Sequence, residues 1–148
     1  MNANCVGEVK LSYRKTSKKL GKVVCGSDAY EYLIKTYRKG TICYKEYFKV
    51  LLLNNNNDIL GHAVISEGGI TATCADIRIV FQAALLANAT AIIISHNHPS
   101  GSLKPSTDDT NLTNRIKRAG DVMNIKLLDH IILTEDGYCS FRDEGILY

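Results

Sequence analysis

Two stretches of this sequence, AIIISHNHPSG at residues 91–101 and PSTDD at residues 105–109, decide which fold and chemistry to expect of the chain. The apolar run at residues 91–94 predicts a short buried strand. Because residues i and i+2 of a strand point to the same side, we expect His96 and His98 to project together from its C-terminal end. Two imidazoles held in this way are suited to bind one metal ion.

The residues that follow the two histidines predict a loop and then a helix. The prolines and glycine of this segment prevent the strand from continuing. Ser106 has a side chain preferred at a helix N-cap, and Asp109, three residues later, falls in the first helical turn on the same side. Three ligands from two elements leave one position for water, as in catalytic zinc sites. We therefore predict that His96, His98 and Asp109 bind about one Zn²⁺ per chain, with iron and manganese as alternative metals.

The pattern His-x-His, seven residues, Ser-x-x-Asp places four residue types at fixed spacing across a strand, a loop and a helix. The alternative interpretation is that the histidines end a buried strand and that Ser106 and Asp109 merely cap a helix. A lone His-x-His pair would favour that alternative. The complete constellation favours the metal site instead.

His96, His98, Ser106 and Asp109 resemble the metal-binding motif of the JAMM (JAB1/MPN+) metalloprotease superfamily, and HNHPSG at residues 96–101 resembles its RadC-like branch. Three further stretches are similar to that branch: YFKVLLLN at 47–54, LDHIIL at 128–133 and YCSFRDEG at 138–145. The similarity covers residues 27–148. It implies an α/β fold with a single mixed β-sheet flanked by helices, the JAB1/MPN (cytidine-deaminase-like) architecture.

Hydrolysis at such a metal also needs a carboxylate that takes a proton and returns it to the leaving amine. The resemblance implies Glu46, which lies directly before the strand expected at residues 48–53. Glu67 is the competing candidate, because at the end of the next expected strand it can also reach the site.

Ser106 has two expected roles that do not exclude each other. As an N-cap it stabilises the helix that carries Asp109. As the serine matching that of JAMM proteases, it donates a hydrogen bond to the oxyanion of the tetrahedral intermediate. The pair Asp129-His130 is either a support that orients a ligand imidazole or a structural pair. The structural interpretation is preferred, since an Asp-His pair at the start of a strand usually is structural.

The chain is predicted to have two parts. Residues 1–26 form a basic N-terminal arm in which residues 8–13 alternate polar and apolar side chains, as an edge strand does. This arm is either a solvated surface segment or a basic tail that meets phosphate. Residues 27–148 form the RadC-like JAB/MPN metal-binding domain.

Within the second part, strands and helices alternate. Ser27 is the expected N-cap of a first helix. The ranges predicted as strands are 48–53, 59–66, 91–95, 126–134 and 138–141, with the first two joined as a hairpin. Further helices are expected over residues 75–88, with Leu85 on the buried face, and from Ser106 onward, with Met123 in the core.

Composition indicates a single globular domain of cytoplasmic origin. The 148 residues carry a net charge of +3, which by itself says little about nucleic acid. No apolar run reaches the ~20 residues needed to span a bilayer, so no membrane association is expected. Five widely spaced cysteines without a Cys-x-x-Cys pair argue for reduced thiols rather than a disulfide framework.

The functional hypothesis is a zinc-dependent hydrolase of the JAMM type that cleaves a peptide or isopeptide bond in a protein or peptide substrate. One alternative is a DNA-associated repair or mobile-element factor that binds nucleic acid through the basic arm. Another is a non-catalytic binding module that retains the metal. The oligomeric state, and the need for an activating partner, are left open by the sequence.

Overall fold

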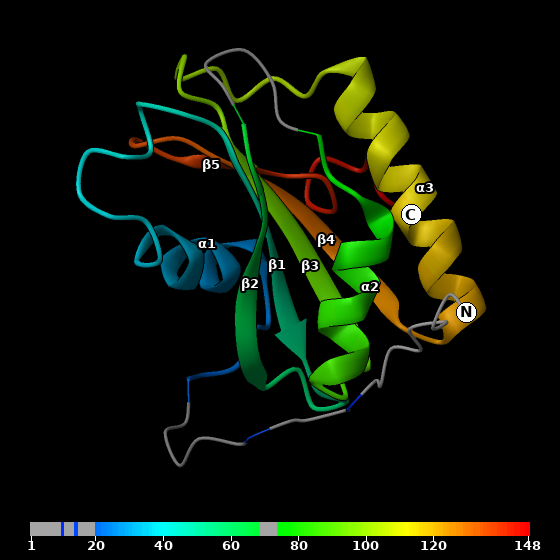
Figure 1. Ribbon diagram of the computed structural model, residues 1–148. Helices are drawn as coiled ribbons and strands as arrows, with labels where there is room; N and C mark the ends of the chain where they lie inside the picture. Colours follow the sequence, from blue (N-terminus) through cyan, green and yellow to red (C-terminus); the bar gives the residue numbers. More distant parts are fainter. Residues whose placement is uncertain (1–9, 11–13, 15–19, 69–73) are drawn as a thin grey trace, which may run out of the picture.

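The computed structural model describes residues 10, 14, 20–68 and 74–148, which form a mixed five-stranded sheet with helices on both faces (Figure 1). In chain order the elements are α1 (Gly26–Ile34), β1 (Tyr47–Leu53), β2 (Ile59–Glu67), α2 (Ile77–Leu86), β3 (Ala91–Asn97), α3 (Thr107–Met123), β4 (Lys126–Leu133) and β5 (Tyr138–Ser140).

The strands lie in the order β2-β1-β3-β4-β5. Strand β1 runs antiparallel to both β2 and β3, whereas β3 and β4 are parallel and are connected through α3. Helices α2 and α3 cover one face of the sheet, and α1 covers the other (Figure 1). The predicted fold class, a single mixed sheet flanked by helices, is therefore confirmed.

The central strand β3 is buried on both faces, because helices lie against each of them. Ile94 belongs to the core under α2 and α3, where it joins Phe81. Its neighbour Ile93 belongs to the core under α1, where it joins Leu33. This alternation continues to the strand end and places the side chain of His96 on the α2/α3 face.

The predicted N-cap of the first helix was wrong. Helix α1 begins one residue before Ser27, and Cys25 is its N-cap. The reason is the carboxylate of Asp28, which accepts the backbone N–H groups of Cys25 (3.1 Å) and Val24 (2.7 Å). An acid at the third helical position therefore closes a capping box with Cys25, so the helix begins before Ser27.

Two apolar residues that were predicted to lie in the core are exposed, Leu85 by 55% and Met123 by 45%. In α2 the buried stripe runs instead through Ala84, and in α3 it ends at Gly120. The buried position of Ala84 agrees with the prediction, whereas Gly120 has no side chain and is not detected by a pattern of apolar side chains.

Gly120 is expected to be intolerant of a side chain. A Cβ at this position would lie 2.3 Å from the carbonyl oxygen of Ile125, because the chain turns back against the end of α3. Gly120→Ala should therefore lower the free energy of unfolding by about 1–3 kcal/mol, despite the better helix propensity of alanine. Urea unfolding measures this change. Gly137→Ala is the control, since its Cβ would meet Leu103 at an ordinary 3.8 Å. Equal losses in both variants would contradict the prediction.

Most of the expected N-terminal arm, and all of the expected edge strand at residues 8–13 except residue 10, lie outside the described residues, so both stay predictions. Within the described part, Val23 and Lys22 run beside the turn that joins β1 and β2. No helix there is both long and apolar enough to cross a membrane. The four described cysteines are unpaired thiols.

Candidate metal centre

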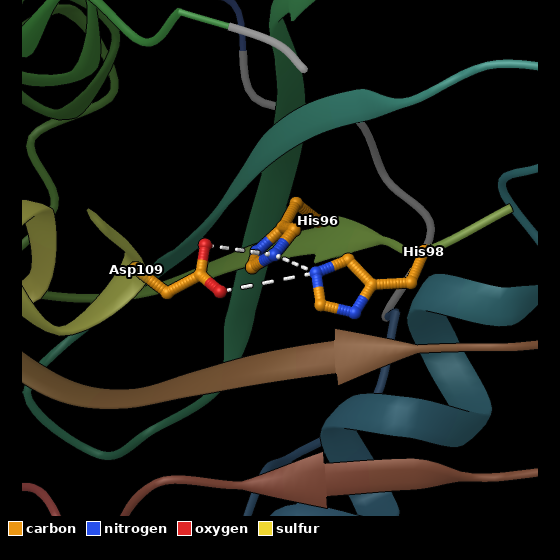
Figure 2. Close-up of side chains that lie close together, drawn as sticks. All are labelled: His96, His98 and Asp109. Atoms are coloured by element: carbon orange, nitrogen blue, oxygen red, sulfur yellow. Dashed lines mark hydrogen bonds and ion pairs between the residues drawn. The ribbon is translucent and has the colours of Figure 1, made fainter. Parts of the chain in front are cut away.

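The structure brings the three predicted ligands together at one end of the sheet (Figure 2). The Nε2 atoms of His96 and His98 are 2.9 Å apart. The Asp109 carboxylate lies 3.1 Å from Nε2 of His96 and 3.8 Å from Nε2 of His98. Ligands of a tetrahedral ion with bonds of ~2.0–2.1 Å lie about 3.3–3.4 Å from one another. The three groups therefore have the spacing that a metal ion needs, and this triad can hold one.

His96 is the buried member of the triad and is held by the sheet. It pairs across the strands with Phe48, and the two rings stack at 6.2 Å with an interplanar angle of 10°. Its side chain is only 2% exposed, against 18% for His98 and 16% for Asp109. Solvent therefore reaches the centre from the side of His98 and Asp109.

His98 lies just beyond β3 and is oriented by the loop that follows it. Its backbone N–H donates to the carbonyl of Leu133 at 3.0 Å. Its ring atom Nδ1 lies 2.7 Å from the carbonyl oxygen of Ser102. A carbonyl oxygen can only accept, so Nδ1 carries a proton and Nε2 is the ring atom that faces the centre. The tight turn between them passes through Gly101, whose φ of 79° favours glycine.

Asp109 is fixed by the N-terminus of α3. Ser106 and Asp109 form a capping box, in which Ser106 N–H donates to the Asp109 carboxylate (2.7 Å) and Asp109 N–H donates to Ser106 Oγ (3.1 Å). Burial disfavours the charged carboxylate. The hydrogen bond and charge of His96, together with the hydrogen bonds of Ser106, outweigh this effect of burial. They hold the pKa of Asp109 well below its usual range. Asp109 is therefore an anion at neutral pH, as a metal ligand must be.

Ser106 is exposed and lies where α3 begins, as predicted. Its oxygen already accepts the N–H of Asp109, which accounts for the capping role. A hydroxyl can accept and donate at the same time. Ser106 therefore keeps a proton that can be offered to a reacting group beside the centre.

The two candidate glutamates lie differently with respect to the sheet. Glu67 pairs directly with Tyr47, whose ring packs against Tyr37 on the α1 face. Residues directly opposite each other in a sheet share a face, so Glu67 points away from the face that carries His96. Its carboxylate is exposed and pairs with Lys45 Nζ at 2.5 Å. The structure does not bring Glu67 to the metal ligands.

Glu46 is half-buried and lies immediately before β1. The register pairs Phe48 with His96, and continuing it by two residues sets position 46 across from His98. Position 46 itself lies before β1, so alternation does not fix its face, and burial, together with the weaker effect of the charge of Glu46, raises the pKa of Tyr37 on the α1 face. In the register, however, Glu46 lies next to a predicted metal ligand, whereas Glu67 does not. This placement favours Glu46 over Glu67 as the proton carrier, and the assignment itself stays a prediction.

Asn97, between the two histidine ligands, was not recognised from the sequence. It is fully buried, and its side chain points to the α1 face. Its amide group donates to the carbonyls of Ile42 (2.7 Å) and Lys45 (2.9 Å), and its oxygen accepts the N–H of Tyr47 (2.8 Å). These hydrogen bonds hold the segment on both sides of Glu46 against β3.

His130 was interpreted as structural, but it contacts a predicted ligand. Its Nε2 lies 2.8 Å from Nδ1 of His96, and its ring is completely buried. Burial lowers the pKa of His130 well below its ordinary value, so the ring is neutral. The neighbouring Asp129 points to the other face and accepts from Ser140 Oγ at 2.6 Å. Asp129 is therefore structural, as expected, whereas His130 contacts the candidate metal centre.

Comparisons with known proteins agree with this architecture. The family model described as the RadC-like JAB domain matches residues 23–146. A UPF0758 protein of Flavobacterium johnsoniae is 44% identical over 86% of this chain and 55% of its own length. A UPF0758 protein of Chlorobaculum tepidum is 41% identical over 85% of the chain and 55% of its own length. One of Clostridioides difficile is 34% identical over 99% and 66%, respectively.

The chain therefore spans little more than half the length of the first two of these relatives, 55% in each case. The family model, by contrast, matches most of the chain, from residue 23 to residue 146. It includes β1, β3 and α3, and with them every predicted metal ligand. This chain belongs to the RadC-like JAB domain family.

Proposed function

We propose that this chain is a metal-dependent hydrolase of the JAMM type that cleaves a peptide or isopeptide bond. The observation that carries the proposal is the convergence of His96, His98 and Asp109 at the spacing of metal ligands, with His98 Nε2 facing the other two and Asp109 charged. The JAMM motif, which these residues match in this sequence, supports the same reaction class. Two nitrogen donors and one carboxylate suit Zn²⁺.

The chemistry divides between the ion and the side chains around it. When bound, zinc would act as a Lewis acid and lower the pKa of a coordinated water toward ~7. Glu46 takes the proton of the attacking water and returns it to the leaving amine. The Ser106 hydroxyl donates a hydrogen bond to the oxyanion that develops on the scissile carbonyl. His96, His98 and Asp109 would hold the ion between the end of β3 and the start of α3.

A test of the reaction class uses the purified chain with and without metal. Zinc-loaded protein is incubated with a library of peptides and isopeptide-linked lysines, and products are detected by mass spectrometry. We expect cleavage that a chelator abolishes and that added zinc restores. Zinc-loaded protein that cleaves no member of the library would contradict the proposal and favour the non-catalytic metal-binding module.

The DNA-associated alternative depends on the basic arm, most of which lies outside the described residues. It stays a prediction, as does the cytoplasmic location. The DNA-binding and hydrolase hypotheses differ in one measurement. Binding to DNA through the basic arm requires an affinity that falls steeply with salt concentration, whereas hydrolysis of an amide bond has no such requirement.

Replacing Ser106 should separate its two roles. Ser106→Ala removes the oxyanion donor, and we expect turnover to fall by about 10²–10³. Loss of the cap should cost about 1 kcal/mol of unfolding free energy. Steady-state rates and urea unfolding measure the two effects, with zinc content followed in parallel. Ser106→Thr keeps the hydroxyl and serves as the control. A rate loss no larger than the loss of folded or zinc-loaded protein would leave Ser106 as a cap only.

A further inference from the structure

A continuous chain of short contacts starts at one predicted metal ligand and ends at the backbone of another. His96 Nδ1 lies 2.8 Å from His130 Nε2. The other nitrogen of that ring, His130 Nδ1, lies 2.6 Å from Thr113 Oγ1. Thr113 Oγ1 in turn lies 2.6 Å from the carbonyl oxygen of Asp109. His96, His130 and Thr113 are all buried, with residue exposures of 1%, 0% and 2%, respectively.

The protons in these contacts can be counted from the Asp109 end. The Asp109 carbonyl has no proton, so the close contact with Thr113 requires that the threonine hydroxyl donates to it. Thr113 has no second proton, and its oxygen can then only accept from His130. His130 Nδ1 is therefore the protonated nitrogen of that ring.

The count continues to the metal ligand. The complete burial of His130 disfavours the charged form of its ring, and in the neutral ring a proton on Nδ1 leaves Nε2 with a lone pair. That lone pair accepts a hydrogen bond from His96, which places a His96 proton on Nδ1. The other ring nitrogen, His96 Nε2, is then the atom that faces His98 and Asp109.

We propose that Thr113 and His130 are positioning residues that set the tautomer and ring orientation of His96, so that its Nε2 is ready to bind a metal ion. The inference rests on the metal site of the proposed function and does not require hydrolysis. It assigns different supports to the two histidine ligands. His98 is oriented by the Ser102 carbonyl in its own loop, whereas His96 is oriented by side chains from β4 and α3.

The arrangement has a consequence for the centre itself. Without a metal ion, the 2.9 Å contact between the two Nε2 atoms needs a proton on one of them, and a bound cation would take the place of that proton. Moreover, α3 supplies both Asp109 and, one turn later, Thr113, so the same helix supports a ligand and the group that orients another ligand. Outer hydrogen bonds of this kind typically change metal affinity by 10–100-fold.

Zinc affinity of a Thr113 series tests the proposal. Thr113→Val has nearly the same shape but no acceptor for His130, so we expect its zinc dissociation constant, measured by chelator competition, to rise about 10–100-fold. Thr113→Ser keeps the hydroxyl and should bind zinc as the wild type does. Ser95→Ala is the matched control, because this buried hydroxyl in β3 has no partner among the described residues. Unchanged affinity in Thr113→Val would overturn the inference.

A second measurement needs no substitution. Long-range ¹H–¹⁵N spectra of histidine-labelled, metal-free protein report which ring nitrogen of each histidine carries the proton. We expect protonated Nδ1 in His96, His98 and His130 with unprotonated Nε2 in His130, and a mixture of tautomers at His130 in Thr113→Val. A His96 ring without a proton on Nδ1, or a His130 proton on Nε2, in the wild type would overturn the proposed proton order.

The two proposals fail in different ways. Zinc binding that weakens in Thr113→Val, in a protein without hydrolytic activity, would support the role of Thr113 and His130 and contradict the hydrolase. Hydrolysis by the wild type together with unchanged zinc affinity in Thr113→Val would do the reverse.

Discussion

Asp109→Ala and His98→Ala are expected to bind no zinc under conditions in which the wild-type chain binds about one ion. Each substitution leaves two ligands, and the ligands lost are the two more exposed members of the triad. Elemental analysis after gel filtration measures the metal content. Thermal unfolding gives a second readout, since a ligand present at 1,000 times its dissociation constant stabilises the native state by about 4.1 kcal/mol. Added zinc should therefore raise Tm in the wild type and not in the variants.

Asp108→Ala is the matched control for this experiment. Asp108 also lies in the first turn of α3, but it is exposed and does not belong to the ligand triad. Its removal should leave the zinc content unchanged. Retention of zinc by Asp109→Ala, or equal loss in both variants, would mean that the ion is held elsewhere.

Glu46→Gln should abolish most of the hydrolytic activity while the zinc remains bound. Glutamine keeps the size of the side chain but cannot take a proton, and a positioned general base typically contributes 10²–10⁴-fold. We therefore expect turnover to fall by about that factor with an unchanged zinc content. Rates are measured on the substrate found in the library screen, with metal analysis of the same sample.

Glu67→Gln discriminates between the two glutamates. Glu67 is exposed, pairs with Lys45 and lies on the α1 face of the sheet, so its replacement should leave turnover nearly unchanged. A large loss in Glu67→Gln with normal rates in Glu46→Gln would reverse the assignment. Full activity in both variants would show that neither glutamate carries the proton.

The sequence predicted the strand and helix that carry the triad because their signals are local. An apolar run ending in His-x-His specified the end of β3, and the serine N-cap with an acid three residues later specified the start of α3. Short-range geometry then sufficed to expect His96, His98 and Asp109 close together. Local signals misled where a nearby group competed, as when Asp28 moved the cap of α1 from Ser27 to Cys25.

What only the tertiary structure decided is which distant residues meet the triad. His130 reaches His96 because β4 lies parallel to β3 in a particular register. The sequences of two strands that are separated by a helix do not determine that register. The separation of Glu67 from the triad likewise follows from the pairing of β1 with β2. A shift of one residue in either register would send these side chains to the opposite face. Periodicity and capping depend on near neighbours in the chain, whereas the face that a side chain shares with another strand depends on how the whole sheet is packed.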